Sequence, residues 1–174
     1  IVSNASCTTN CIVPVLRHFI DTFGIHSANF TTIHASTASQ KVVDTAHSKS
    51  RTSRSIFNNI IPHTTGASSS INKIFPSLKG KIHGTSVRVP VNNVSLVDMN
   101  IKLEKETNID ELIKSMESNK FLSVINENIV SSDLMTTTCP SIIDSKTIME
   151  LGDNTFKIMI WYDNEWSYAA QTIK

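Results

Sequence analysis

Apolar and polar positions along the chain show two periodicities, one typical of a helix and one typical of a strand. Between residues 8 and 23 the apolar side chains recur every three or four positions, and Gly24 follows them. This spacing predicts an amphipathic helix that ends at the glycine. Pro14 lies inside the span and marks either the end of the first turn or a kink. Two shorter helices are expected over 67–75, before Pro76, and from a capping Asn108 to residue 118.

Several segments rich in β-branched and aromatic residues are expected to form strands. They span residues 29–35, 85–89, 94–103, 142–150 and 156–162. A polar stretch over 41–59 interrupts this pattern and is typical of a long functional loop. The chain therefore combines strands and helices without an internal repeat.

The composition of the chain excludes several classes of protein. The chain has 174 residues, of which 40% are hydrophobic, and its 16 basic side chains nearly balance its 15 acidic ones. This fits one globular domain and favours neither disorder nor a nucleic-acid-binding surface. No apolar run approaches the roughly 20 residues that a membrane-spanning helix needs.

The three cysteines do not form a metal-binding pattern. Cys7 and Cys11 are four residues apart, and Cys139 is isolated, so no second pair completes a zinc site. We expect reduced thiols in a cytoplasmic protein. Cys11 is assigned to packing inside the first helix, and Cys139 receives no role.

Cys7 lies between the hydroxyl side chains of Ser6 and Thr8, at the predicted start of the first helix. Unpaired N–H groups and the positive end of the helix dipole at such a position favour a thiolate. A single cysteine is more often a small core residue, but these neighbours favour a nucleophile. His34 ends a predicted strand before a loop, and a histidine beside Cys7 would supply a proton acceptor and donor near neutral pH.

The segment over residues 3–11, Ser-Asn-Ala-Ser-Cys-Thr-Thr-Asn-Cys, resembles the active-site segment of phosphorylating glyceraldehyde-3-phosphate dehydrogenases. Four further segments match in the family's order, and the resemblance extends over nearly the whole chain. They are residues 31–35, 60–67, 87–90 and 161–165. The fold that this resemblance implies is α+β, a mixed and largely antiparallel sheet with helices packed on one face.

The resemblance also implies a reaction. Cys7 attacks the aldehyde carbon of glyceraldehyde 3-phosphate, and His34 manages the alcohol proton. Hydride then leaves for NAD, and inorganic phosphate releases the acyl group from its thioester. Hydroxyl, backbone N–H and guanidinium groups suit the phosphates. The residues that match phosphate-binding positions are Ser6, Thr8, Thr37, Thr65, Gly66 and Arg88, with Arg51 placed at inorganic phosphate and Asn164 at the nicotinamide.

The cofactor is expected to be NAD, with NADP as the alternative. Asp44 is followed by Thr45-Ala46, without the proline common in NAD-specific members, and such a change can accompany NADP use. No G-x-G-x-x-G occurs, so the family's dinucleotide-binding domain is expected outside a single catalytic domain over 1–174. We therefore expect the chain alone to be inactive, and its parent enzyme to be a homotetramer.

Two other functions stay open at this point. Erythrose-4-phosphate dehydrogenase shares the cysteine segment but passes the acyl group to water, whereas residues 64–67 offer a second anion site that fits phosphorolysis better. The third function is a non-catalytic interaction module. A papain-like protease is disfavoured, because its histidine follows the cysteine at a much larger separation than that between Cys7 and His34.

Overall fold

One mixed sheet organises the computed structural model, which describes residues 5–173. Ser3 and Asn4 of the cysteine segment therefore lie outside the described residues. The strand order across the sheet is β2-β3-β1-β4-β7-β6-β5. The described strands are β1 (Ile25–His34), β2 (Ile61–His63), β3 (Ile82–Arg88), β4 (Ser95–Leu103), β5 (Leu122–Ile125), β6 (Ser141–Glu150) and β7 (Thr155–Tyr162).

Most strand pairs are antiparallel. Only β1–β3 and β5–β6 are parallel among the described pairs, while β2–β3, β1–β4, β4–β7 and β6–β7 are antiparallel. The prediction of a mixed, largely antiparallel sheet is confirmed.

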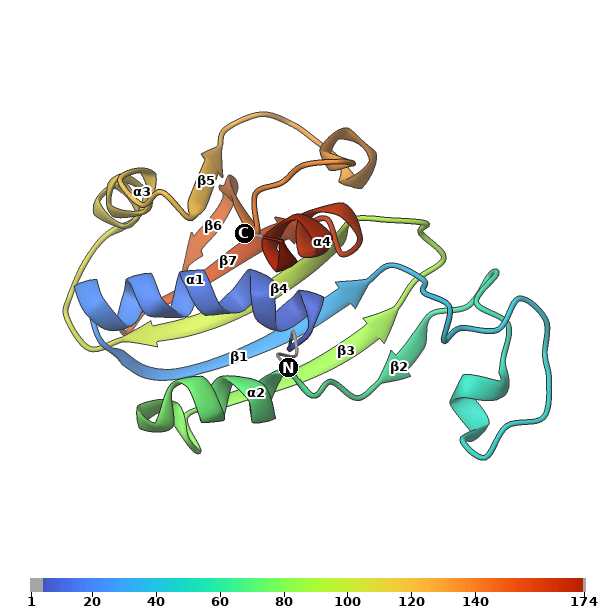
Figure 1. Ribbon diagram of the computed structural model, residues 1–174. Coiled ribbons are helices and arrows are strands. Elements are labelled where there is room, and N and C mark those ends of the chain that lie inside the picture. Colours follow the sequence, from blue (N-terminus) through green and yellow to red (C-terminus); the bar gives the residue numbers. More distant parts are fainter. Residues whose placement is uncertain (1–4, 174) are drawn as a thin grey trace.

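The helices α1 (Cys7–Thr22) and α2 (Ala67–Ile74) lie side by side on one face of this sheet, as Figure 1 shows. The shorter α4 (Trp166–Thr172) lies in front of the same face, and α3 (Ile109–Glu117) packs near β5 and β6. The prediction of helices on one face of an α+β domain is thus confirmed. Short 3₁₀ turns add η1 (Ser50–Ser53), η2 (Pro76–Leu78) and η3 (Ser131–Leu134).

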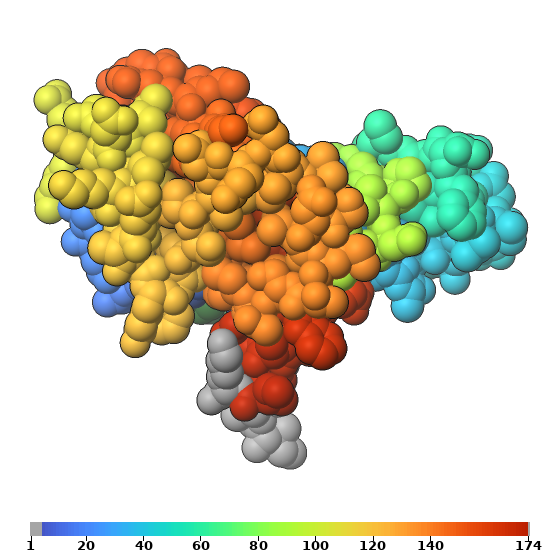
Figure 2. Space-filling model, turned by 90° about the horizontal axis from the view of Figure 1, so that it is seen from above, coloured from blue at the N-terminus to red at the C-terminus, as the bar shows by residue number. Residues whose placement is uncertain are grey.

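The polar segment over 41–59 is a loop, as expected, and contains η1. Figure 2 shows this cyan segment projecting from one side of the molecule. Arg54 Nε donates to Asp44 Oδ2 at 2.8 Å, and Ser55 N donates to Asp44 Oδ1 at 2.7 Å. The Ser55 N–H, and next to it the Arg54 charge, hold the pKa of Asp44 below its ordinary value. Arg54 therefore has a structural contact inside the loop.

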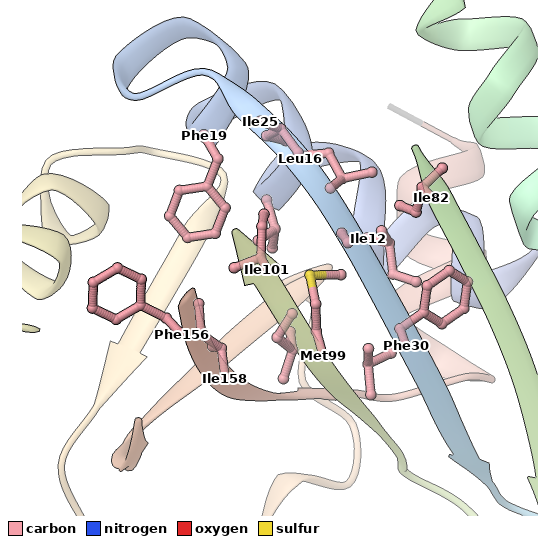
Figure 3. Packing of buried hydrophobic residues seen from close by; sticks show 14 of the residues in the cluster. Ile12, Leu16, Phe19, Ile25, Phe30, Ile82, Met99, Ile101, Phe156 and Ile158 are labelled. Carbon is pink, nitrogen blue, oxygen red and sulfur yellow. The ribbon is translucent and has the colours of Figure 1, made fainter. Parts of the chain in front are cut away.

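The core lies between α1 and the sheet. Ile12, Leu16 and Phe19 of α1 face the sheet, and Figure 3 shows them close to apolar side chains of the central strands. Along β4 and β7 buried and half-buried positions alternate, as expected for a sheet covered on one face. Burying each large apolar side chain contributes about 1.5–3 kcal/mol relative to leaving it exposed.

The other sheet face is only half-buried. Leu96, Met159 and Trp161 lie on it, together with an ion pair of 2.7 Å between Lys157 Nζ and Asp98 Oδ2. Neighbouring positions in β4 and β7 alternate between this face and the core. The face therefore mixes apolar and charged side chains.

The local signals at the first helix act as predicted, with a shift of one residue. Helix α1 begins at Cys7, where the Ser6 hydroxyl accepts from Thr9 N at 3.0 Å. It continues through Pro14 and ends before Gly24, whose φ of 73° suits a glycine. Neither a break nor a new helix start accompanies the proline. The capping role of Asn108 is also confirmed, because its side chain accepts from Glu111 N at 2.9 Å.

Candidate active site

The candidate site lies where several elements share one end. The parallel strands β1 and β3 finish together, and His34 is the register partner of Arg88. Helices α1 and α2 both begin at this end of the sheet (Figure 1). Cys7 is the first residue of α1, so the fold directs a helix start toward two strand ends.

Cys7 and His34 form the centre of the site. The Cys7 sulfur lies 3.2 Å from His34 Nε2, within hydrogen-bonding distance. The histidine is 4% exposed, whereas the cysteine is half-buried and reachable. This is the separation at which a thiol can pass its proton to an imidazole.

The other nitrogen of His34 has two neighbours. Nδ1 lies 2.7 Å from the Ala35 carbonyl oxygen and 2.6 Å from Arg88 Nη1, which also donates to Ala35 O at 3.0 Å. A proton on Nδ1 is accepted by Ala35 and leaves Nε2 free to receive the Cys7 proton. A proton on Nε2 instead lets Arg88 donate to Nδ1, so each neutral tautomer has its own partner.

Burial favours the neutral form of both central groups. Burial lowers the pKa of His34 to about 4, against the effect of the Ala35 carbonyl, and the Arg88 charge lowers it further. Burial also raises the pKa of the Cys7 thiol, an effect that Thr8 and Arg88 only partly oppose. Desolvation thus opposes the effect of the helix start, and the thiolate expected from the sequence stays a prediction.

The hydroxyl side chains that flank Cys7 are engaged within the protein. Ser6 caps α1 and lies 2.7 Å from the Thr9 hydroxyl. Thr8 is buried, and its Oγ1 lies 2.9 Å from the hydroxyl of Tyr162. The two hydroxyl groups therefore support the start of α1 through bonds within the protein. The backbone N–H groups of Ser6 and Thr8 belong to the first turn of this helix.

The start of α2 is open to a ligand. Gly66 precedes the helix and is exposed, and a Cβ added there would meet no atom within 4 Å. The Thr65 hydroxyl accepts from Ala67 N at 3.1 Å. Arg88 Nε is buried without a hydrogen-bond partner among residues 5–173. An anion near these groups would find unused donors.

Thr37 follows β1 in a tight turn close to His34. Its hydroxyl donates to Gln40 Oε1 at 3.0 Å, and Gln40 N donates to Thr37 O at 2.9 Å. The turn thus fixes Thr37 three residues after the central histidine. It is half-buried, at the edge of the site.

Arg51 is not brought to Cys7. It lies in η1 and lines a separate cavity of about 660 Å³ with Lys49, His63 and Thr85. Thr85 alternates with Arg88 along β3, so the two side chains point to opposite faces of the sheet. The predicted group of phosphate ligands is therefore divided between two places in this structure.

Asn164 is buried immediately after β7. Ser95 Oγ donates to its Oδ1 at 2.8 Å and accepts from Ala35 N at 3.0 Å. Asn164 Nδ2 also donates to Glu165 Oε1 at 3.3 Å. The amide is thus connected through Ser95 to the strand end that carries His34, and one N–H and one oxygen lone pair remain for a ligand.

The described residues offer neither a metal centre nor a membrane span. No group of three or more His, Cys, Asp or Glu side chains in residues 5–173 is arranged to hold a metal ion. Within the same range, none of the helices is long and apolar enough to cross a membrane.

Comparison with known proteins decides the family. Residues 6–164 match the family model described as glyceraldehyde 3-phosphate dehydrogenase, C-terminal domain. The chain belongs to this family.

Curated relatives agree. The chain is 42% identical over 177 residues to "Glyceraldehyde-3-phosphate dehydrogenase 2" of Staphylococcus epidermidis, covering 100% of the chain and 52% of the relative. It is 41% identical over 180 residues to "Glyceraldehyde-3-phosphate dehydrogenase, cytosolic" of Chlamydomonas reinhardtii, covering 99% and 53%. The chain therefore spans about half the length of these relatives.

Sequence reasoning missed three residues that build this glyceraldehyde 3-phosphate dehydrogenase C-terminal domain site. Tyr162 and Thr32 contact each other behind Cys7, at 2.8 Å between their hydroxyl oxygens, and Ser95 joins Asn164 to Ala35. Tyr162 lies inside the matched segment 161–165, so that match was an available signal. Thr32 likewise lies inside the matched segment 31–35, whereas Ser95 had no comparable signal and becomes recognisable only through strand register.

Proposed function

We propose that the chain is the catalytic domain of an oxidoreductase that converts glyceraldehyde 3-phosphate and inorganic phosphate to 1,3-bisphosphoglycerate. This reaction belongs to glycolysis and gluconeogenesis, and NAD is the favoured hydride acceptor, with NADP as the alternative. The observation that carries the proposal is the 3.2 Å contact between Cys7 Sγ and His34 Nε2, beside Arg88. The family membership and the relatives' names support it.

In the first step the Cys7 sulfur forms a bond to the aldehyde carbon. The thiol proton passes to His34 Nε2 and then to the carbonyl oxygen, which gives a thiohemiacetal. His34 is suited to this transfer because its low pKa makes the imidazole ready to release the proton again. While His34 carries this proton, Nδ1 donates to the Ala35 carbonyl, which holds the ring orientation.

Oxidation requires a nicotinamide dinucleotide, which supplies the hydride acceptor when it is bound. The Asn164 amide fits a carboxamide group, because it retains one donor and one acceptor beside the strand end that carries His34. His34 Nε2 accepts the hydroxyl proton of the thiohemiacetal, and Cys7 then carries the acyl group as a thioester. Attack by inorganic phosphate breaks the sulfur–carbon bond and returns the electron pair to Cys7.

The phosphate groups are proposed to lie at the open end of the sheet. Arg88, with its unpartnered Nε, and the start of α2 at Gly66 provide positive charge and N–H donors. Thr37 and Thr65 stand at the edges of the same region, and Ser6 and Thr8 contribute the first turn of α1. The role of Arg51 at inorganic phosphate stays a prediction, since the loop over 41–59 would have to bring it closer.

The decisive experiment measures acyl phosphate formation by the full-length protein, with glyceraldehyde 3-phosphate or erythrose 4-phosphate and with or without inorganic phosphate. We expect an acyl phosphate from glyceraldehyde 3-phosphate that depends on phosphate. Turnover of erythrose 4-phosphate that ignores phosphate would favour the alternative dehydrogenase. If neither aldehyde reacts and Cys7 is alkylated no faster than Cys139, the interaction module is the better function.

We also propose a homotetrameric assembly and a cytoplasmic location for the full-length protein. The family's dinucleotide-binding domain is proposed to lie outside this chain, so the chain alone should not reduce NAD. The half-buried sheet face with Leu96, Met159 and Trp161 fits contacts with further copies, in line with a homotetramer. A cytoplasmic location agrees with the name of the Chlamydomonas relative. No nucleic acid or membrane partner is proposed.

A further inference from the structure

A row of hydroxyl groups leads from the middle of the sheet to the Cys7 sulfur. The Tyr162 hydroxyl, at the end of β7, lies 2.8 Å from Thr32 Oγ1 of β1 and 2.9 Å from Thr8 Oγ1 of α1. Thr8 directly follows Cys7 in α1, and its hydroxyl and backbone N–H both act to lower the pKa of the Cys7 thiol. Three elements thus contribute to one chain of hydrogen bonds.

This row is sealed from solvent. Tyr162 is 1% exposed, Thr8 is 4% exposed and Thr32 is 1% exposed. Burial raises the pKa of Tyr162 well above its ordinary value, so its hydroxyl keeps its proton near neutral pH. The phenol therefore has one hydrogen to donate and an oxygen to accept with.

Each hydroxyl has a single hydrogen, so the row must point one way. When the Thr8 hydrogen is directed at the sulfur, the Thr8 oxygen can receive the Tyr162 hydrogen, and Tyr162 can receive the Thr32 hydrogen. Hydrogen bonds that point the same way polarise one another and are stronger around an anion. In the opposite direction Thr8 donates to Tyr162 and has no hydrogen for Cys7.

The same tyrosine also contacts the other central residue. The rings of Tyr162 and His34 have centroids 6.0 Å apart and an interplanar angle of 80°, an edge-to-face arrangement. Tyr162 thus contacts both the His34 ring and the Thr8 hydroxyl.

We propose that Tyr162 is a positioning residue, which directs the Thr8 hydroxyl toward Cys7 and stabilises negative charge on the sulfur. Tyr162 acts in the two steps in which the sulfur is anionic. These are the step after the thiol has lost its proton and the step in which the thioester breaks. The inference rests on the proposed function in one respect, the use of Cys7 as the nucleophile. It adds a reason for a buried phenol beside the central pair.

The test is the pH profile of Cys7 alkylation by iodoacetamide in the full-length protein, read by peptide mass spectrometry. Tyr162→Phe keeps the ring and removes the hydroxyl. It is expected to move the midpoint of the Cys7 profile to higher pH and to lower the rate at pH 7 about three- to ten-fold, the effect of one hydrogen bond. Cys139 in the same sample is the internal reference.

Two further variants make the result specific. Thr32→Val removes the far end of the row with little change in shape, and should shift the profile in the same direction by less. Tyr168→Phe, a half-buried tyrosine on α4, is the matched control and should leave the profile unchanged.

A Tyr162→Phe protein with native circular dichroism and an unshifted Cys7 profile would overturn the inference. If Tyr162→Phe fails to fold, a folded Thr32→Val with an unshifted profile would overturn it equally. A wild-type Cys7 that reacts no faster than Cys139 would count against the proposed nucleophile instead, so the two failures are distinguishable.

Discussion

Arg88 lies directly opposite His34 in the parallel register of β1 and β3, and its Nη1 is 2.6 Å from His34 Nδ1. The cation therefore acts on the imidazole from the side away from Cys7. It lowers the pKa of His34 in addition to the effect of burial, and its attraction for negative charge lowers the pKa of Cys7. One side chain thus tunes both members of the central pair.

Removing this charge should be visible at His34 itself. In Arg88→Gln the pKa of His34 is expected to rise toward its ordinary value, because a neighbouring cation no longer disfavours the imidazolium. A histidine titration followed by NMR measures the shift. Arg51→Gln is the matched control, since Arg51 lines a different cavity. An unchanged His34 titration in Arg88→Gln would contradict the electrostatic role.

The proton transfer should depend on the imidazole. His34→Gln is expected to lower the rate of aldehyde oxidation by the full-length enzyme about 10²- to 10⁴-fold, the usual contribution of a general acid–base. Cys7→Ser should lower it to background. His83→Gln removes an exposed histidine from β3 and serves as control. Activity of His34→Gln within a factor of two of wild type would exclude His34 from the proton path.

Acid should weaken the fold through His34. Its pKa is about 4 in the folded chain against an ordinary 6.5, so between these values the unfolded chain binds a proton that the folded chain does not. Stability is therefore complete above pH 6.5 and falls as the pH decreases toward 4, by about 3 kcal/mol for this group. Thermal melts of wild type and His34→Gln over this range measure the difference. We expect a smaller loss in the variant, and equal losses would contradict a buried neutral imidazole.

Close packing between β1 and β3 should make Gly84 irreplaceable. Gly84 is the register partner of Phe30, and an added Cβ would clash with the Phe30 ring. Gly84→Ala is expected to destabilise the protein by about 1–3 kcal/mol or more through overpacking. Gly66→Ala is the control, because space is open there and its φ is −81°. Urea denaturation of both variants would show whether the first is the more costly.

The elements with clear periodicity were predictable from the sequence. The first helix, the Asn108 cap and the central strands β1, β4 and β7 lie close to the expected positions. Two short strands and one short helix were not predicted. Strand β2 (Ile61–His63) has three residues with a proline among them, β5 (Leu122–Ile125) has four, and α4 (Trp166–Thr172) has fewer than two full turns. Segments of this length show no measurable period and depend on their neighbours.

The sequence predicted which residues form the candidate site better than it predicted their ionisation. Residue types and the family resemblance brought Cys7, His34 and Arg88 together, and the fold places them in contact. The ionisation of Cys7 was not predictable, because the helix start is a local feature and desolvation depends on the whole tertiary structure. The position of Arg51 likewise depends on the course of a long loop, which the residue pattern does not determine.

The last strand along the chain is also an inner strand of the sheet. Strand β7 lies between β4 and β6, and Tyr162 at its end contacts Thr8, 154 residues earlier. Such long-range pairing makes folding slow and prevents the sheet from closing on a ribosome until synthesis of this domain is almost complete. The contact between Tyr162 and Thr8 should accordingly be one of the latest events in folding, and the reactivity of the neighbouring Cys7 thiol a sensitive reporter of when the domain is finished.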